Sequence, residues 1–156
     1  MAALTIADII ALDFGYLSGQ DLLDFVPSQF LINQETITSG LLQRSVNKAY
    51  AEIISQLSSK CQIATELTKK FPTGTDADTR SQVIVKYVAL MSIKNCVSRA
   101  QGLPDHLKSN FGEVNEALLA IRNGQASIPD IQQEAAPNQG NISKTELIKS
   151  SYNSLG

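Results

Sequence analysis

The residues of this chain that could do chemistry are few, and they do not form the pattern of a reactive centre. The single histidine among the 156 residues, His106, follows Asp105 directly. A catalytic histidine needs a nucleophile or a carboxylate that the fold brings to its ring, and adjacency in sequence does not meet that need. We therefore interpret His106 as a solvent-exposed residue of a loop.

Two pairs of acidic residues raise the questions of a cation site and of an acid–base pair. Asp76 and Asp78 have the alternate spacing of a calcium loop, but the other ligand positions of such a loop are missing. Glu113 and Glu116 lie three residues apart on one face of a predicted helix, where acidic pairs are usually solvated. Neither pair predicts a site.

The two cysteines, Cys61 and Cys96, lack both the C-x-x-C spacing and the histidine partners of a metal or redox pair. We interpret them as small residues of the core. The sequence also lacks a glycine-rich phosphate loop. It therefore predicts no catalytic residue, no metal ligand and no cofactor, and we expect a protein that is not an enzyme.

Length and composition predict one globular domain without a basic surface for nucleic acid. Charged residues make up 18% of the chain and the net charge is -2, while 43% of the residues are hydrophobic. The opening residues, MAALTIADIIALDFG, lack the basic region of a secretory signal. We expect a chain that stays inside the cell that makes it, with reduced thiols.

The stretch from Ser81 to Ala100 is the element around which the others should be arranged. It is apolar on almost every side, which is typical of a helix buried on all sides, and it contains neither Gly nor Pro. Lys86, Lys94 and Arg99 make it a poor membrane span. We expect a central helix that the remaining helices wrap.

Three further helices are predicted before and after this central one. Thr5 begins a capping box, so a short helix should run from Ile6 to Leu12. Apolar residues at spacings of three and four predict a long helix from about Thr36 to Lys60 and a last helix from about Asn110 to Asn123. The fold class is therefore all-α, a small bundle of about four helices around a central apolar helix.

The segments between and after these helices are less regular. Gln20 to Phe25 has room for one more helical turn, and Asp78 or Thr79 is expected to cap the central helix. From Gln125 onward Gln, Asn, Ser, Gly and Pro dominate, so residues 1–124 should form the helical domain and residues 125–156 an extended arm. Scattered apolar residues leave two interpretations of the arm open, a segment that orders on a partner or a plain tail.

Four segments of the chain resemble, in order and spacing, the helices of head–tail connector proteins of tailed bacteriophages, which are also called adaptor or head-completion proteins. The segments are Ala3–Ile10, Leu41–Ile54, Tyr87–Arg99 and Asn115–Gly124. The second leads into an A-x-x-E-I-x-x-x-L run, and the last reads E-A-L-L-A-I-R-N-G where the family pattern is A-x-x-x-L-x-x-I-x-x-G. The resemblance covers about residues 3 to 130.

The resemblance implies a structural protein of the virion neck that is present in the bacterial host cytoplasm during assembly. It implies a homo-oligomeric ring, expected to be twelvefold, that binds the portal protein and a tail-side component. DNA would pass through the channel of the ring without specific binding, and no membrane would be involved. No catalytic residue is implied.

A ring subunit of this kind needs contacts to its neighbours and to the portal. The resemblance implies docking through the C-terminal arm, and the apolar residues of the opening segment are candidates for the contact between subunits. The candidates for docking in the C-terminal arm are Ile142, Leu147, Ile148, Tyr152 and Leu155. The candidates for the subunit interface are Leu22, Leu23, Phe25, Val26, Phe30 and Leu31. The alternative for this second group is that its members only cap the bundle. The alternative for the whole chain is a small cytoplasmic helical module for binding or regulation.

Overall fold

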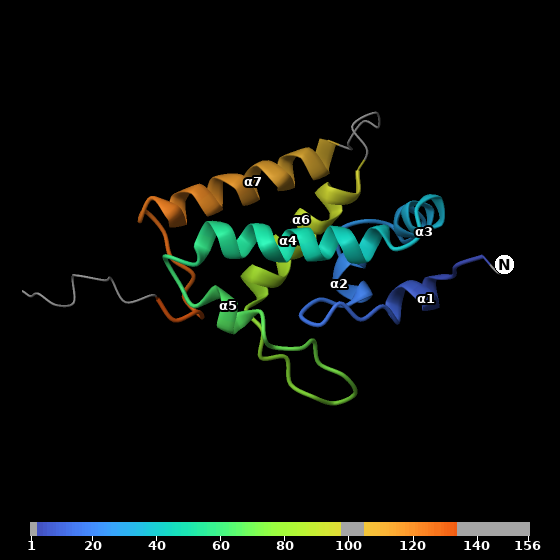
Figure 1. Ribbon diagram of the computed structural model, residues 1–156, viewed down its shortest axis with the longest axis horizontal. Helices are drawn as coiled ribbons and strands as arrows, with labels where there is room; N and C mark the ends of the chain where they lie inside the picture. Colours follow the sequence, from blue (N-terminus) through green and yellow to red (C-terminus); the bar gives the residue numbers. More distant parts are fainter. Residues whose placement is uncertain (1–2, 98–104, 134–156) are drawn as a thin grey trace, which may run out of the picture.

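The fold is all-α, as the sequence predicts. The computed structural model describes residues 3–97 and 105–133, and within these ranges the chain forms helices and two isolated β-bridges but no strand. Figure 1 shows the elements in order. They are α1 (Ile6–Ile10), α2 (Gly19–Leu23), α3 (Ser28–Ile37), α4 (Leu41–Leu57), α5 (Ile63–Glu66), α6 (Gln82–Cys96) and α7 (Asp105–Arg122).

Helix α6 is the predicted central helix, and most of its side chains are buried. It packs against α2, α4 and α7, and residues as far apart as Ile84 and Cys96 contribute to the core. A narrow exposed strip with Val83, Lys86 and Lys94 is the exception to the predicted burial on all sides. The cap prediction was wrong, because the hydroxyl of Ser81, and neither Asp78 nor Thr79, accepts the hydrogen bond from the first turn of the helix.

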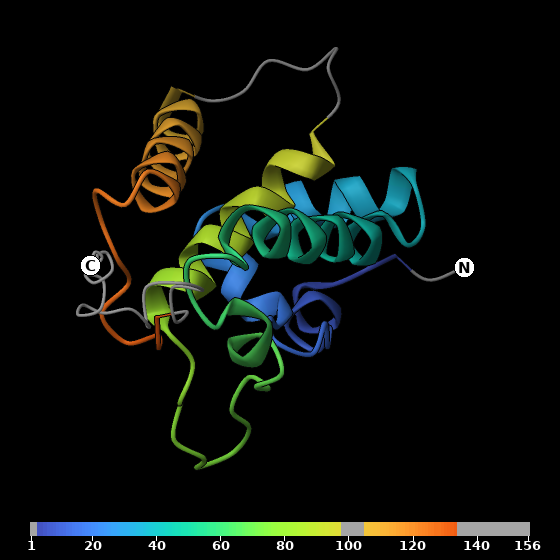
Figure 2. The ribbon, with the colours of Figure 1, turned by 60° about the vertical axis from the view of Figure 1, so that its left-hand side comes forward.

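Helices α4 and α7 cover α6 with the apolar stripes that their sequences predict. Helix α4 lies across α6, and α7 packs against both, as Figures 1 and 2 show. The buried positions of α4 and α7 recur every three or four residues, so one face of each helix is removed from water. In α7 these positions are Leu107, Phe111, Val114, Leu118 and Ile121. This helix begins at Asp105, earlier than the predicted Asn110.

The predicted long helix from Thr36 to Lys60 is two helices in the structure. Helix α3 ends at Ile37 and α4 begins at Leu41, with Gly40 between them at φ +81°, a left-handed conformation that disfavours any residue with a side chain. The carboxylate of Glu35 then accepts hydrogen bonds from the backbone N–H groups of Gly40 and Leu42. The glycine breaks the helix, and the glutamate satisfies two N–H groups at the start of the next one.

Two capping boxes set the N-terminal helices. The box between Thr5 and Asp8 starts α1, as predicted, although α1 ends at Ile10 and not at Leu12. A second box, between Ser18 and Asp21, starts α2 and was not anticipated. Because both helices are very short, these side-chain bonds to the backbone and the packing of α1 on α2 and α3 hold them in place.

The beginning of the predicted arm packs against its own domain. Residues 125–133 contain no helix, yet Ile128 and Ile131 are buried. The backbone N–H of Gln62 donates to the carbonyl of Gln132 at 2.8 Å, next to a bridge between Cys61 and Gln133. The five docking candidates of the arm, Ile142 to Leu155, lie outside the described residues. Among the described helices none is long and apolar enough to cross a membrane.

Candidate functional site

The densest polar cluster in the described part of the chain surrounds the buried guanidinium of Arg80. Its Nη1 donates to the carbonyl of Tyr16 at 2.7 Å and to Asp21 at 2.8 Å. Its Nη2 donates to Asp21 and to Asp78, and its Nε donates to Asp78 at 2.9 Å. All five N–H donors of the guanidinium are thus used, which is the condition under which a buried arginine is stable.

A buried carboxylate, Glu66, forms the second half of the cluster. Its Oε2 accepts from the hydroxyl of Tyr16 and from the backbone N–H of Ser81, each at 2.7 Å. Its Oε1 lies 2.8 Å from the Nζ of Lys69. Ser81 continues the chain of contacts by donating its hydroxyl to Asp130 at 2.9 Å. The cluster therefore joins the N-terminal helices, α5, the start of α6 and the C-terminal segment.

The electrostatics of the cluster hold its groups in fixed charge states. Burial, together with the hydrogen bond to Glu66, raises the pKa of Tyr16 far above its usual range. The hydrogen bonds from Arg80 lower the pKa of Asp78 to about 2. Burial alone would lower the pKa of Arg80, but its bonds to Asp78 and Asp21 more than offset this and raise it. A tyrosine that stays neutral and an aspartate that stays charged are suited to a structural role more than to proton transfer near pH 7.

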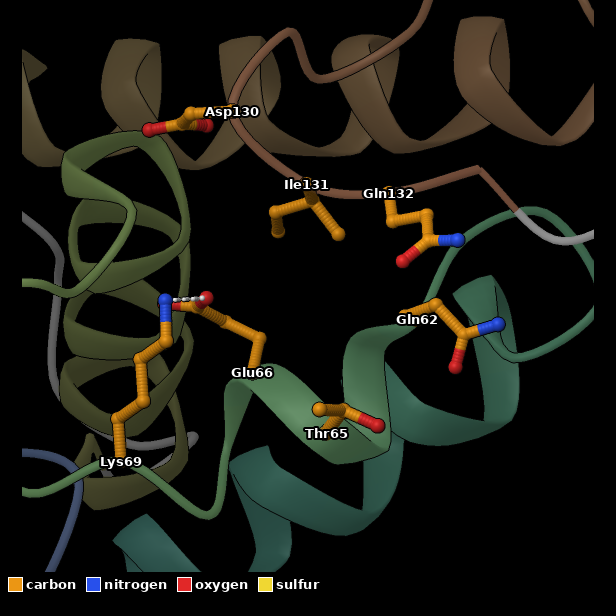
Figure 3. Close-up of a pocket in the computed structure, with 7 residues that line it drawn as sticks. All are labelled: Gln62, Thr65, Glu66, Lys69, Asp130, Ile131 and Gln132. Atoms are coloured by element: carbon orange, nitrogen blue, oxygen red, sulfur yellow. Dashed lines mark ion pairs between the residues drawn. The ribbon is translucent and has the colours of Figure 1, made fainter.

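An open cavity of about 310 Å³ adjoins this cluster, between α5 and the C-terminal segment. Figure 3 shows Ile131 pointing into the space and the ion pair between Lys69 and Glu66 on one side of it. The other lining residues are Gln62, Thr65, Asp130 and Gln132. Its volume is at the lower end of ligand pockets. The lining can exchange hydrogen bonds with a polar group, but it places no nucleophile beside a free base.

The residues that we weighed for chemistry do not come together. His106 is exposed, as predicted, although it lies in the first turn of α7 and not in a loop. Glu113 and Glu116 are exposed on the same helix. Within residues 3–97 and 105–133, no group of three or more His, Cys, Asp or Glu side chains could hold a metal ion.

The calcium-loop pair and the cysteines have structural positions. Asp78 binds Arg80, while Asp76 is exposed and accepts from the hydroxyl of Thr73. Cys61 and Cys96 are buried, which confirms their interpretation as core residues, and burial raises the pKa of Cys96.

The six candidates for the subunit interface divide into two groups. Leu22, Val26 and Leu31 are buried in the core of their own domain, so these side chains have no surface for a neighbour. The other three, Leu23, Phe25 and Phe30, are partly buried and pack against the same core. This arrangement agrees with the alternative that Leu22 to Leu31 only cap the bundle.

Sequence reasoning missed the exposed isoleucines of the N-terminal helices. Ile6 and Ile10 on α1 are 53% and 44% exposed, and Ile37 at the end of α3 is 73% exposed. Ile6 and Ile10 are four residues apart and share one face, and Ile9, three residues after Ile6, borders the same face. In a short helix with three isoleucines, the sequence does not say which face meets the core.

Comparison with known proteins gives no relative. No protein-family model, no curated protein and no solved structure matches this chain.

Proposed function

We propose that the chain is a structural virion protein, a head–tail connector that forms a ring between the portal and the tail and extends the DNA channel. The observation that carries the proposal is the position of the four segments that resemble this family. They fall on α1, α4, α6 and α7, in the expected order, and α4, α6 and α7 pack on one another. The resemblance and the helical core therefore involve the same residues.

The buried polar network inside the domain also supports a structural role. The cluster around Arg80 and Glu66 ties together segments that are 50 or more residues apart in sequence, since Tyr16 binds Glu66 and Asp21 binds Arg80. Buried polar networks with every donor used favour one arrangement of the elements. Such a network would help a ring subunit to present the same surfaces in every copy.

The test is to purify the chain with the portal protein encoded near its gene and to image the complex by electron microscopy. We expect a ring, twelvefold if the resemblance holds, stacked on the portal, with DNA-filled heads that lack tails when the gene is deleted. A gene that lies apart from capsid and tail genes, with no binding to any portal, would instead favour the small cytoplasmic binding or regulatory module.

A further inference from the structure

The outer surface of α1 exposes apolar side chains to water. Ile6 and Ile10 are about half exposed, and Ala7 and Ala11 beside them are exposed as well. We call these four residues the apolar α1 face. Because α1 packs on α2 and α3 through its opposite side, this face has no cover within the described part of the chain.

The segment that carries the apolar α1 face contains charged residues of one sign only. The first 43 residues contain five acidic residues and no Lys or Arg. Asp13 and Asp21 form ion pairs with Lys70 and Arg80, which come from later in the chain. For the other three acidic residues, no ion pair is found within residues 3–97 and 105–133. They are Asp8, Asp24 and Glu35. The N-terminal helices therefore carry three acidic side chains for which the described residues show no ion-pair partner.

The outer surface of α4 has the complementary character. Arg44, Lys48, Ala51, Ile54 and Ser55 are all exposed and lie on one side of the helix. We call these residues the basic α4 face. It carries two positive charges beside two apolar side chains. Glu52, four residues after Lys48, borders the face, is half-buried and accepts a hydrogen bond from Asn95. Figures 1 and 2 show α4 crossing one broad side of the molecule, with α1 at an edge.

We propose that the apolar α1 face of one copy docks on the basic α4 face of the next copy in the ring; the proposal rests on the ring function proposed above. A contact of α1 with α1 would bring two acidic regions together, and a contact of α4 with α4 would bring two basic ones together. Both repel, whereas α1 on α4 pairs opposite charges around apolar centres. Two different surfaces in contact make a heterologous interface, the kind that closes into a ring.

The first experiment measures self-association of the full chain by sedimentation equilibrium, up to about 1 mM, the range where weak contacts are populated. We expect association that increases with concentration and weakens with salt, because exposed charges are screened within about 10 Å at 0.1 M salt. Two double variants, Ile6→Ser with Ile10→Ser and Arg44→Glu with Lys48→Glu, should each weaken association at least about tenfold.

The matched control is Lys86→Glu with Lys94→Glu, which makes the same change of charge on the exposed strip of α6. It should associate like the unchanged chain. All of these positions are exposed, so circular dichroism should show unchanged helix content in every variant. Equal weakening by the control would mean that net charge, and not the basic α4 face, drives association, and it would overturn the proposal.

A mixing experiment tests the head-to-tail geometry. The α1 variant keeps its α4 face, and the α4 variant keeps its α1 face, so a mixture can form one contact but cannot propagate it. We expect the two variants to form a one-to-one dimer when mixed, although each alone is monomeric. A mixture that stays monomeric would overturn the proposal.

The outcomes separate this proposal from the proposed function. Rings that still assemble on the portal from either face variant would overturn the interface and leave the connector function in place. The same holds for a chain that stays monomeric at all concentrations in free solution but forms portal-bound rings unaffected by either change. A chain that neither associates nor binds a portal would contradict both.

Discussion

Arg80 shows how a single side chain can organise several segments. It contacts Tyr16, Asp21 and Asp78 with all five donors, and its guanidinium carbon lies 5.7 Å above the centre of the Tyr16 ring. The side chain is only 4% exposed. The contribution of Arg80 to stability depends on all of its partners being present, because a buried charge that loses its partner destabilises the fold far more than a surface ion pair stabilises it.

We therefore predict that Arg80→Ala destabilises the domain by about 3–5 kcal/mol, because it leaves the buried carboxylate of Asp21 without its cation. Chemical denaturation followed by circular dichroism measures the change. The control is Lys70→Ala, which removes the exposed pair with Asp13, where the two charged atoms are 3.6 Å apart. That change should stay within about 0.5 kcal/mol. Equal losses in both variants would argue against a structural role for Arg80.

Asp78 makes the same cluster sensitive to acid. Arg80 lowers the pKa of Asp78 from 3.8 to about 2 in the folded chain. A lowered pKa stabilises the folded state above the unfolded value, near pH 4, and this stabilisation is lost as the pH falls through about 2. Asp78→Asn should thus lower the free energy of unfolding at pH 6, by about 1 kcal/mol for a partly exposed pair. The difference from the unchanged chain should vanish near pH 2, and a constant difference would refute the assignment.

At the scale of elements, the close approach of α1 and α2 depends on a glycine. A Cβ added at Gly19 would overlap the backbone carbonyl of Ile9. Only a residue without a side chain lets the start of α2 come this near to α1, and the backbone N–H of Gly19 uses the approach to donate to the carbonyl of Leu12 at 3.0 Å. This contact positions the helix that carries the apolar α1 face.

Gly19→Ala should consequently destabilise the domain by about 1–3 kcal/mol, since backbone cannot yield as a flexible side chain does. Gly112 in the middle of α7 is the matched control, because a Cβ there meets nothing within 4 Å. Gly112→Ala should stabilise the helix by about 0.5–1 kcal/mol. Thermal unfolding of the two variants should show shifts of opposite sign, and shifts of the same sign would contradict the packing described here.

At the scale of the whole molecule, residues 125–133 are part of the folded domain. Ile128 and Ile131 are buried, the carbonyl of Gln132 accepts a hydrogen bond from Gln62 just before α5, and Asp130 accepts one from Ser81 just before α6. The position of a truncation therefore matters, because residues 125–133 contribute two buried side chains to the folded domain.

Truncation after Gln133 should leave a folded helical domain, whereas truncation after Gln125 should cost about 3 kcal/mol or more through the loss of two buried isoleucines. Both truncations remove the docking candidates Ile142 to Leu155, but the truncation after Gln133 keeps the buried Ile128 and Ile131, so under the proposed function it tests docking separately from folding. We expect it to weaken binding to the portal or to a neighbouring copy. A chain ending at Gln133 that assembles normally would exclude a docking role for the arm.

Sequence reasoning succeeded where the determining contacts are local. The stripes of α4, α6 and α7 and the box between Thr5 and Asp8 depend on residues within one or two turns. The box between Ser18 and Asp21 had the same local signal and was overlooked. Gly40 interrupts a continuous apolar pattern, and here the single residue outweighed the periodicity because its left-handed backbone cannot continue a helix.

The sequence by itself determined that this chain folds into helices and which faces of the longer ones are apolar, because helical hydrogen bonds and side-chain periodicity are set by near neighbours. Only the tertiary structure decided that Arg80 meets Asp21 and that Glu66 meets Tyr16, partners 59 and 50 residues apart. It also decided that Ile6 and Ile10 stay in water while Ile9 is buried. Burial and side-chain pairing depend on which distant segments of the chain pack together, and a local sequence pattern does not specify those long-range contacts.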